Sequence, residues 1–215
     1  MKESLSSMYR DFHARNGKYG FAHHLTTKGA FFKEMVGKNQ KVLDLGCRDG
    51  VMTSTFASGN EITCVDVDDH ALQLCGAKLS ATLVWHDLND PLPFEDGSFD
   101  VVVLSDVLEH VLLHEQLVKE CNRVMKCGGW FYGSTPNAFY WSNRIKMLRG
   151  IDLVEYIDPT HVRHFALDSL AQLLAGLFHN VEVIPYGRHP FSKRWPTLFA
   201  NDFLWKAQKP EDNLP

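Results

Sequence analysis

Short strand-like runs alternate with helical stretches along most of the chain, and this alternation constrains the fold more than any other sequence feature. Runs rich in β-branched or aromatic residues end in polar or turn-forming residues and are predicted as strands at 41–47, 61–66, 81–85, 99–104 and 129–135. Helices are predicted between them at 51–58, 68–78 and 114–126. Because the strands are apolar enough to be covered on both faces, we expect an α/β fold with a mostly parallel sheet and helices on both faces.

The two ends of the chain extend this pattern. Residues 24–36 are predicted as a helix before the first strand, and residues 1–20 are polar and aromatic without clear period, so we expect 1–36 to form an N-terminal lid and helix. Beyond 135 we predict a short helix at 138–149, an irregular charged stretch at 150–163, an amphipathic helix at 167–178, a strand at 181–186 and a last strand within 199–207. The last two strands would pair through a long hairpin, the final one antiparallel, and complete a seven-stranded sheet in a single domain, 1–215.

Composition excludes several classes of function. The net charge of −4 provides no general basic surface for a phosphate backbone, so nucleic acid is not an expected partner. No apolar stretch has the length of a signal peptide or a membrane span, and we expect a cytoplasmic protein. The five cysteines form no CxxC pair and are odd in number, which indicates small buried apolar residues and neither a zinc site nor a disulfide framework.

The segment Asp44-Leu45-Gly46-Cys47-Arg48-Asp49-Gly50 follows the first predicted strand directly, where an α/β sheet binds ligands. Glycines there permit a sharp turn and close approach of a ligand, although a tight strand-to-helix connection alone would also need them. Asp66 ends the second predicted strand, sixteen residues beyond Gly50, in the position of an acid that accepts hydrogen bonds from both ribose hydroxyls of a nucleoside. Together the two features predict a nucleoside-containing ligand.

Four blocks within 41–135 carry a family resemblance: VLDLGCRDG, VDVDD, HDLNDPLPFEDGSFDVVVLSDVLEHV and RVMKCGGWFYGSTPN. In this order and spacing they resemble the class I S-adenosylmethionine-dependent methyltransferases, and among them the group that includes the ubiquinone-biosynthesis O-methyltransferases. The resemblance implies a Rossmann-like fold, S-adenosylmethionine as cofactor, residues 41–135 as the cofactor-binding core, and 137–165 and 187–200 as substrate-side elements.

The resemblance also implies cofactor-binding residues. The methionine part would lie against Asp44, Gly46, Cys47, Gly50 and Ser105, the ribose against Asp66, and the adenine against Val67, Asp87 and Leu88. Two positions depart from the family pattern. Cys127 stands where a proline commonly precedes Gly-Gly, and Arg48 replaces the usual central glycine; Arg48 could contact the cofactor carboxylate, point outward, or crowd the site.

Transfer to an oxygen acceptor needs alignment and benefits from a base, for which histidine is suited near neutral pH. The candidate catalytic residues are His161, in the segment before the amphipathic helix, and His110, which could equally bond local backbone at a helix start. For His164, His23 and His24 we favour surface or structural roles. We expect no metal site, because Asp106, Glu109 and His110 at i, i+3 and i+4 equally describe a solvated helix face. Several aromatic residues could wall the substrate pocket or pack in the core: Phe139, Tyr140, Trp141, Tyr156, Phe191 and Trp195.

Three other functions compete with a small-molecule methyltransferase. A nicotinamide dehydrogenase would need G-x-G-x-x-G, which Gly46 and Gly50 do not fit. Nucleic-acid amine methyltransferases resemble one another in an Asn/Asp-Pro-Pro-aromatic block after strand four, where this chain has Ser105-Asp106-Val107-Leu108. A noncatalytic domain that binds S-adenosylmethionine or a partner through a degenerate glycine motif is the alternative, and Arg48 supports it. We predict methyl transfer to an oxygen, or in second place a nitrogen, of a small metabolite, lipid precursor or glycan.

Overall fold

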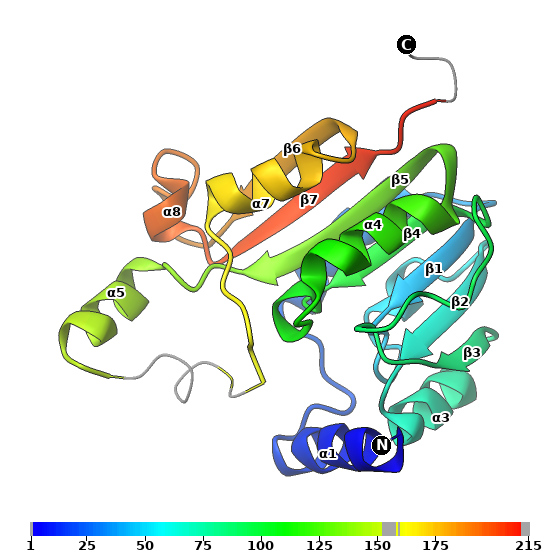
Figure 1. Ribbon diagram of the computed structural model, residues 1–215. Helices are drawn as coiled ribbons and strands as arrows, with labels where there is room; N and C mark the ends of the chain where they lie inside the picture. Colours follow the sequence, from blue (N-terminus) through cyan, green and yellow to red (C-terminus); the bar gives the residue numbers. More distant parts are fainter. Residues whose placement is uncertain (1, 152–157, 159, 212–215) are drawn as a thin grey trace.

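A seven-stranded sheet forms the centre of the molecule (Figure 1). The computed structural model describes residues 2–151, 158 and 160–211. The strands are β1 (Lys41–Leu45), β2 (Glu61–Asp66), β3 (Thr82–Trp85), β4 (Phe99–Ser105), β5 (Met125–Pro136), β6 (His179–Tyr186) and β7 (Asp202–Gln208). Their order is β3-β2-β1-β4-β5-β7-β6, and β7 runs antiparallel to both of its neighbours. The predicted mostly parallel, Rossmann-like sheet with an antiparallel last strand is therefore confirmed.

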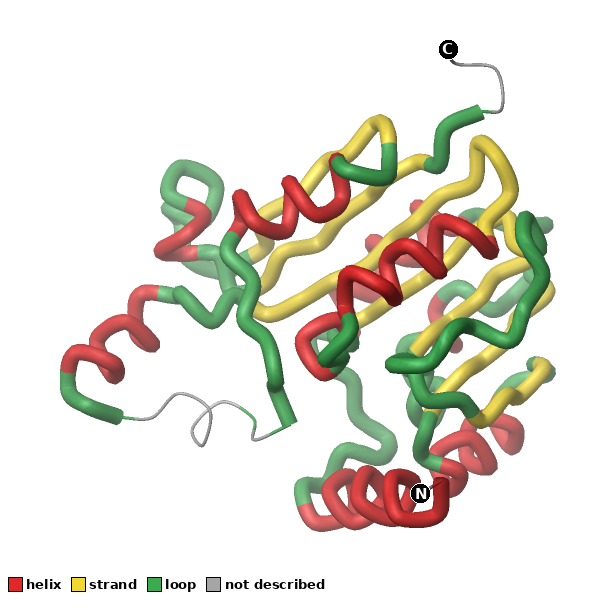
Figure 2. The backbone as a smooth tube through the Cα atoms, viewed as in Figure 1, coloured by secondary structure: helices red, strands yellow, loops and turns green. Residues whose placement is uncertain are grey.

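Helices cover both faces of this sheet (Figure 2). Within the described residues, the α-helices are α1 (Lys2–Arg15), α2 (Leu25–Val36), α3 (Asp69–Lys78), α4 (His114–Val124), α5 (Trp141–Leu148), α7 (Leu167–Ala175) and α8 (Pro196–Phe199), and the 3-10 turns are η1 (Thr53–Thr55) and η2 (Leu108–His110). None of the helices in the described ranges is long and apolar enough to cross a membrane.

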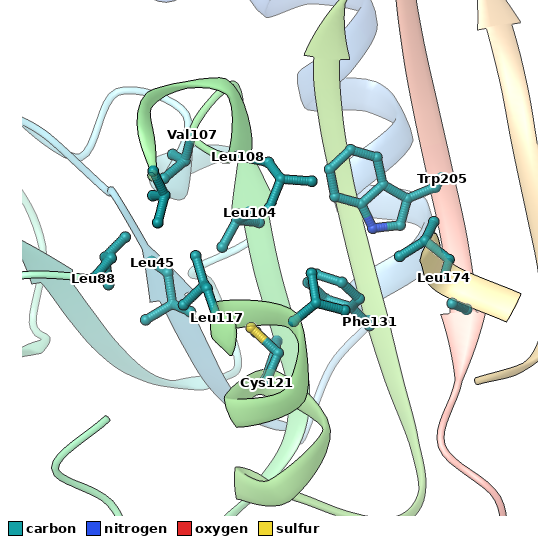
Figure 3. Close-up of a cluster of buried hydrophobic side chains, with 14 of the residues drawn as sticks. Leu45, Leu88, Leu104, Val107, Leu108, Leu117, Cys121, Phe131, Leu174 and Trp205 are labelled. Carbon is teal, nitrogen blue, oxygen red and sulfur yellow. The ribbon is translucent and has the colours of Figure 1, made fainter. Parts of the chain in front are cut away.

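The alternation of side chains along the central strands builds two cores. Leu43 and Leu45 of β1 lie in one buried cluster with residues of α4 and α7, whereas Val42 packs on the opposite face with residues of α2 and α3. Figure 3 shows Leu117 of α4 beside Leu45 in the first of these clusters. Because both faces are covered, the central strands are mostly apolar, and their charged residues, such as Asp44 and Asp66, lie toward the strand ends.

The predicted helix at 51–58 is wrong. The chain forms turns there with only the short η1. Ser54 Oγ donates to the carbonyl of Val51, and Thr55 Oγ1 donates to the carbonyl of Met52. Hydroxyl side chains that bond nearby carbonyls compete with a regular helix, and the β-branched threonines are weak helix formers.

The prediction that all five cysteines are buried holds for four of them and is wrong for Cys127, which is exposed. Cys127 lies within β5, outside the part of the strand that packs in either core. Residues Met125 to Gly129 show little apolar periodicity. The prediction that Cys127 is buried therefore rested only on its being a cysteine.

Candidate functional site

A cavity of about 440 Å³ lies at the carboxyl ends of the central parallel strands. Its volume is in the range of pockets that enclose small molecules. Nine of the ten predicted cofactor residues line it: Asp44, Gly46, Cys47, Arg48, Asp66, Val67, Asp87, Leu88 and Ser105. Gly50 is not among the lining residues; it adopts φ +74°, and a Cβ there would lie 2.7 Å from Cys75 Sγ, so it shapes the turn. Both predicted catalytic residues, His110 and His161, also line the cavity.

The glycine-rich turn is held by Asp66. Gly46 has φ +73° and packs against Val107, where a Cβ would come within 2.3 Å of a methyl group. Arg48 also adopts the left-handed conformation, with φ +49°, which explains why glycine is favourable at this position. Its backbone N–H donates to Asp66 Oδ2 at 2.8 Å, and the N–H of Asp68 donates to Asp66 Oδ1 at 2.9 Å. Each carboxylate oxygen retains a free lone pair with which to accept a ligand hydroxyl.

Asp44 lies under the turn and is almost completely buried. Thr53 Oγ1 donates to Asp44 Oδ2 at 2.6 Å. Burial raises the pKa of Asp44 to about 7, against which the Thr53 hydrogen bond acts. The cavity floor therefore holds a carboxyl group whose charge changes near neutral pH.

The N-terminal segment closes one side of the cavity, with Leu5, Tyr9, Phe12 and His13 of α1 among the lining residues. The Arg48 guanidinium donates to the carbonyl of Phe21, and the backbone N–H of Gly20 donates to Asp49 Oδ2. Tyr19 Oη donates to Asp68 Oδ2 at 2.7 Å. Residues 1–20 gave no period from which to predict this placement, and only their aromatic content hinted at a role beside the cavity.

The predicted adenine side contains both apolar and acidic groups. Leu88 is buried, and Asp87 Oδ1 accepts hydrogen bonds from the backbone and side-chain nitrogens of Asn89, both at 2.9 Å. The backbone carbonyl of Val67 accepts from the indole N–H of Trp85 at 2.7 Å. These contacts fix the loops after β2 and β3 and leave an apolar wall with one acid at its edge.

Glu109, His110 and His161 come together in the lining of the same cavity. One potential ligand atom from each lies within 4.8 Å of the others, so the three could hold a metal ion. The sequence predicted no metal site because that prediction took Asp106 as the neighbour of Glu109 and His110. His161 is far away in sequence and was not part of it. The loop carrying His161 docks because Val162 N–H and Arg163 N–H donate to the Glu109 carbonyl and because Thr160 Oγ1 bonds His110 Nδ1 at 2.9 Å.

Burial keeps this cluster uncharged near neutral pH. It raises the pKa of Glu109 to about 8, and the nearby Asp106 carboxylate acts in the same direction. Burial lowers the pKa of His161 to about 4, helped by His110, whose own pKa burial also lowers. Glu109 Oε1 and His161 Nδ1 are buried and have no hydrogen-bond partner among the described residues. Both are therefore available to a ligand.

A buried lysine that the sequence analysis missed supports the same wall. Lys28 Nζ donates to both carboxylate oxygens of Asp106 at 2.7 Å and to Asp202 Oδ1 at 3.0 Å. Burial acts to lower the pKa of Lys28, but the two carboxylates outweigh it and hold the pKa above its ordinary value. The signal was present in the sequence, because Lys28 falls at i, i+4 and i+8 with the buried Phe32 and Val36.

The remaining candidates divide between the cavity and the surface. His23 and His24 line the cavity, whereas His164 does not. Trp141, Phe191 and Trp195 neither line the cavity nor pack in the core, since they are 40%, 49% and 47% exposed. Tyr156 lies outside the described residues.

A family model for a methyltransferase domain matches residues 43–133. The "Probable S-adenosylmethionine-dependent methyltransferase Rv3030" of Mycobacterium tuberculosis is 32% identical over 149 residues, which cover 64% of this chain and 52% of that protein. The chain thus spans about half the length of the curated relatives that it matches at 32% identity. A ubiquinone biosynthesis O-methyltransferase of Burkholderia vietnamiensis is 27% identical over 174 residues, covering 76% of this chain and 74% of that protein.

Solved structures share the fold. A SAM-dependent methyltransferase of Thermotoga maritima superposes with a TM-score of 0.72 at 14% identity, covering 95% of this chain and 99% of that one. One from Archaeoglobus fulgidus gives 0.71 at 20% identity, covering 94% and 99%. Residues 43–133 are thus similar to a methyltransferase domain, and the chain shares the fold of these solved methyltransferases.

Proposed function

We propose that this chain transfers a methyl group from S-adenosylmethionine to a hydroxyl oxygen of a small metabolite, lipid precursor or glycan. The observation that carries the proposal is the pair of buried, unpartnered atoms Glu109 Oε1 and His161 Nδ1, which line the same cavity as nine predicted cofactor residues. A nitrogen acceptor is the second possibility, since the same base could take a proton from an amine.

The residues present fit the cofactor. Asp66 can accept from ribose hydroxyls, Asp87 from an amino group, and Val67 and Leu88 offer apolar contact to a base. S-Adenosylmethionine supplies a methyl group already activated by a positively charged sulfur. Asp44 and Asp66 give the cavity acidic groups that favour a cationic ligand.

The chain's own task is to position the acceptor and remove its proton. His161 is neutral near pH 7 because burial lowers its pKa to about 4, so its unpartnered Nδ1 can accept a hydrogen bond from an acceptor hydroxyl. The proton moves to Nδ1 as the oxygen gains the methyl group and the hydroxyl becomes strongly acidic. Glu109, protonated below about pH 8, can donate a hydrogen bond that orients the acceptor oxygen. His110 is held by Thr160 through Nδ1 and is better suited to fixing the His161 ring, whose centroid lies 4.7 Å away.

Calorimetric titration of the chain with S-adenosylmethionine and, separately, with NAD and NADP tests the cofactor. Micromolar binding of the first alone is the expected result. A panel of hydroxylated and amine acceptors then tests transfer. Cofactor binding without turnover on any acceptor would favour the noncatalytic alternative, and binding of NAD instead would refute the proposal. Arg48 gives the alternative little support, because its guanidinium bonds the Phe21 carbonyl and lies 3.5 Å from Asp49.

A further inference from the structure

Helix α5 exposes an apolar face. Trp141, Ile145 and Leu148 recur at i, i+4 and i+7 and therefore share one side of the helix, where they are 40%, 46% and 87% exposed. No residue of α5 is buried. A surface helix of a globular protein normally turns such a face toward its core, so within the described part of the chain this face lacks a partner.

A second apolar surface lies in 187–199. Phe191 and Trp195 are about half exposed, and their rings contact each other, with centroids 5.2 Å apart. Phe199 lies 5.9 Å from Phe191, and the His189 ring stacks on Phe199 at 4.1 Å. Packing among these rings holds the two exposed aromatic side chains in place and lowers the entropy lost if they contact a partner.

Asn137 ties the two surfaces together at the cavity. Its buried side-chain nitrogen donates to the Ala200 carbonyl at 2.8 Å, and its backbone N–H donates to the Asn201 carbonyl at 2.8 Å. Pro136 and Asn201, where the two segments leave the sheet, line the cavity. Figure 1 shows α5 and α8 projecting at the same end of the sheet, beyond β5 and β7. We call the exposed residues of 141–151 and 187–199 the docking face.

The docking face is cationic although the chain is acidic. It contains no Asp or Glu, whereas the whole chain has 26 acidic and 22 basic residues. Its basic residues are Arg144, Arg149, Arg188, Lys193 and Arg194. Arg144 of α5 and Arg149, which caps its carboxyl end, fall on either side of the apolar face by helical position. Exposed Trp, Phe and Leu bordered by Lys and Arg are typical of segments that lie in a membrane interface.

We infer that the docking face binds the surface of an anionic lipid bilayer and so brings the cavity to an acceptor held in that bilayer. Anionic headgroups complement the basic residues, and the acyl boundary accepts the apolar side chains. A second copy of this chain would instead oppose two cationic faces. The binding of the docking face to a bilayer does not depend on the proposed function. The claim that the methyl acceptor is held in that bilayer rests on the proposed function.

Flotation of the chain with vesicles tests the contact. We expect the chain to float with vesicles that contain phosphatidylglycerol and not with pure phosphatidylcholine vesicles, and to be released as salt rises. Arg149→Gln/Arg194→Gln should weaken binding about 25-fold, because each basic residue near an anionic surface contributes about fivefold. Leu148→Ser should weaken it about tenfold and cannot disturb the core, since Leu148 is 87% exposed.

Lys33→Gln/Lys119→Gln is the matched control, since it removes the same charge at exposed positions of α2 and α4. It should bind as the unmodified chain does. Failure of the unmodified chain to float, equal losses in the control, or a Leu148-dependent dimer in gel filtration without vesicle binding would each overturn the inference. Calorimetry with S-adenosylmethionine on the same variants should show unchanged affinity. If the unmodified chain does not bind S-adenosylmethionine, the proposed function is refuted, and the vesicle experiment still tests the contact with the bilayer.

Discussion

Replacing Glu109 by Gln should make the protein less sensitive to alkaline pH. Glu109 is 1% exposed and accepts a hydrogen bond from Thr135 Oγ1 at 3.0 Å. Its pKa is raised from 4.5 to about 8 in the folded chain, chiefly by burial. Between these two values the folded state holds a proton that the unfolded state releases. The free energy of unfolding therefore falls as pH rises through this window.

The size of the effect follows from the width of the window. The separation between 4.5 and about 8 corresponds to an upper bound of about 5 kcal/mol, at about 1.4 kcal/mol per pKa unit. Because Glu109 lines a cavity that can admit water, we expect a loss of about 2–5 kcal/mol between pH 4.5 and pH 9. Glutamine has the shape of the protonated acid and does not ionise, so Glu109→Gln should remove this loss.

The assay is urea unfolding of both proteins at pH 5 and pH 9. The difference in unfolding free energy between Glu109→Gln and the unmodified chain should shift in favour of the variant at pH 9, while groups common to both, such as Asp44, cancel. Glu115→Gln, at an exposed position of α4, is the control and should show no such shift. An identical difference at both pH values would refute a protonated Glu109 and with it the hydrogen bond proposed to orient the acceptor.

Four further predictions address the site. Asp66→Ala should lower the affinity for S-adenosylmethionine by about 2–4 kcal/mol, because two charge-assisted hydrogen bonds are lost; calorimetry checks it, and unchanged affinity would remove Asp66 from the cofactor site. His161→Ala should reduce transfer at least about 100-fold with cofactor binding intact, and full activity would exclude it as the base. Gly46→Ala should lower the unfolding free energy by about 2–4 kcal/mol, since its φ is positive and its Cβ would overlap Val107; a denaturant curve unchanged from the parent would contradict this. Lys28→Met should cost about 3–5 kcal/mol in the same experiment by removing the cation shared by the buried Asp202 and the partly buried Asp106, and a neutral result would mean that these acids are protonated or hydrated.

Most of the sheet could be predicted because its signals are local. The runs at 61–66 and 99–104 coincide with β2 and nearly with β4, since an apolar strand covered on both faces reads as such from its own residues. The prediction was wrong at 51–58, where hydroxyl side chains bond backbone carbonyls and leave only a 3-10 turn. There the outcome depended on hydrogen bonds that hydrophobic period does not describe.

For the candidate site, the sequence indicated the edge of the sheet but not the set of partners. Motif residues such as Asp44 and Asp66 lie at the carboxyl ends of β1 and β2, so the parallel topology brings them to one edge. The aromatic candidates Trp141 and Trp195 were predicted as pocket or core residues and are on the surface instead. Residue type alone does not distinguish a pocket wall from an interfacial surface, because both need exposed apolar side chains.

By itself, the sequence determined the α/β class, the order of the strands along the chain, the turn after β1 and the acid at the end of β2, because period and motif act over a few residues. Only the tertiary structure decided that Lys28 meets Asp202, 174 positions away, that His161 joins Glu109, and that α1 closes the cavity. These pairings depend on how distant segments dock, and burial at those contacts then sets which groups carry charge. Local patterns contain no information on that docking.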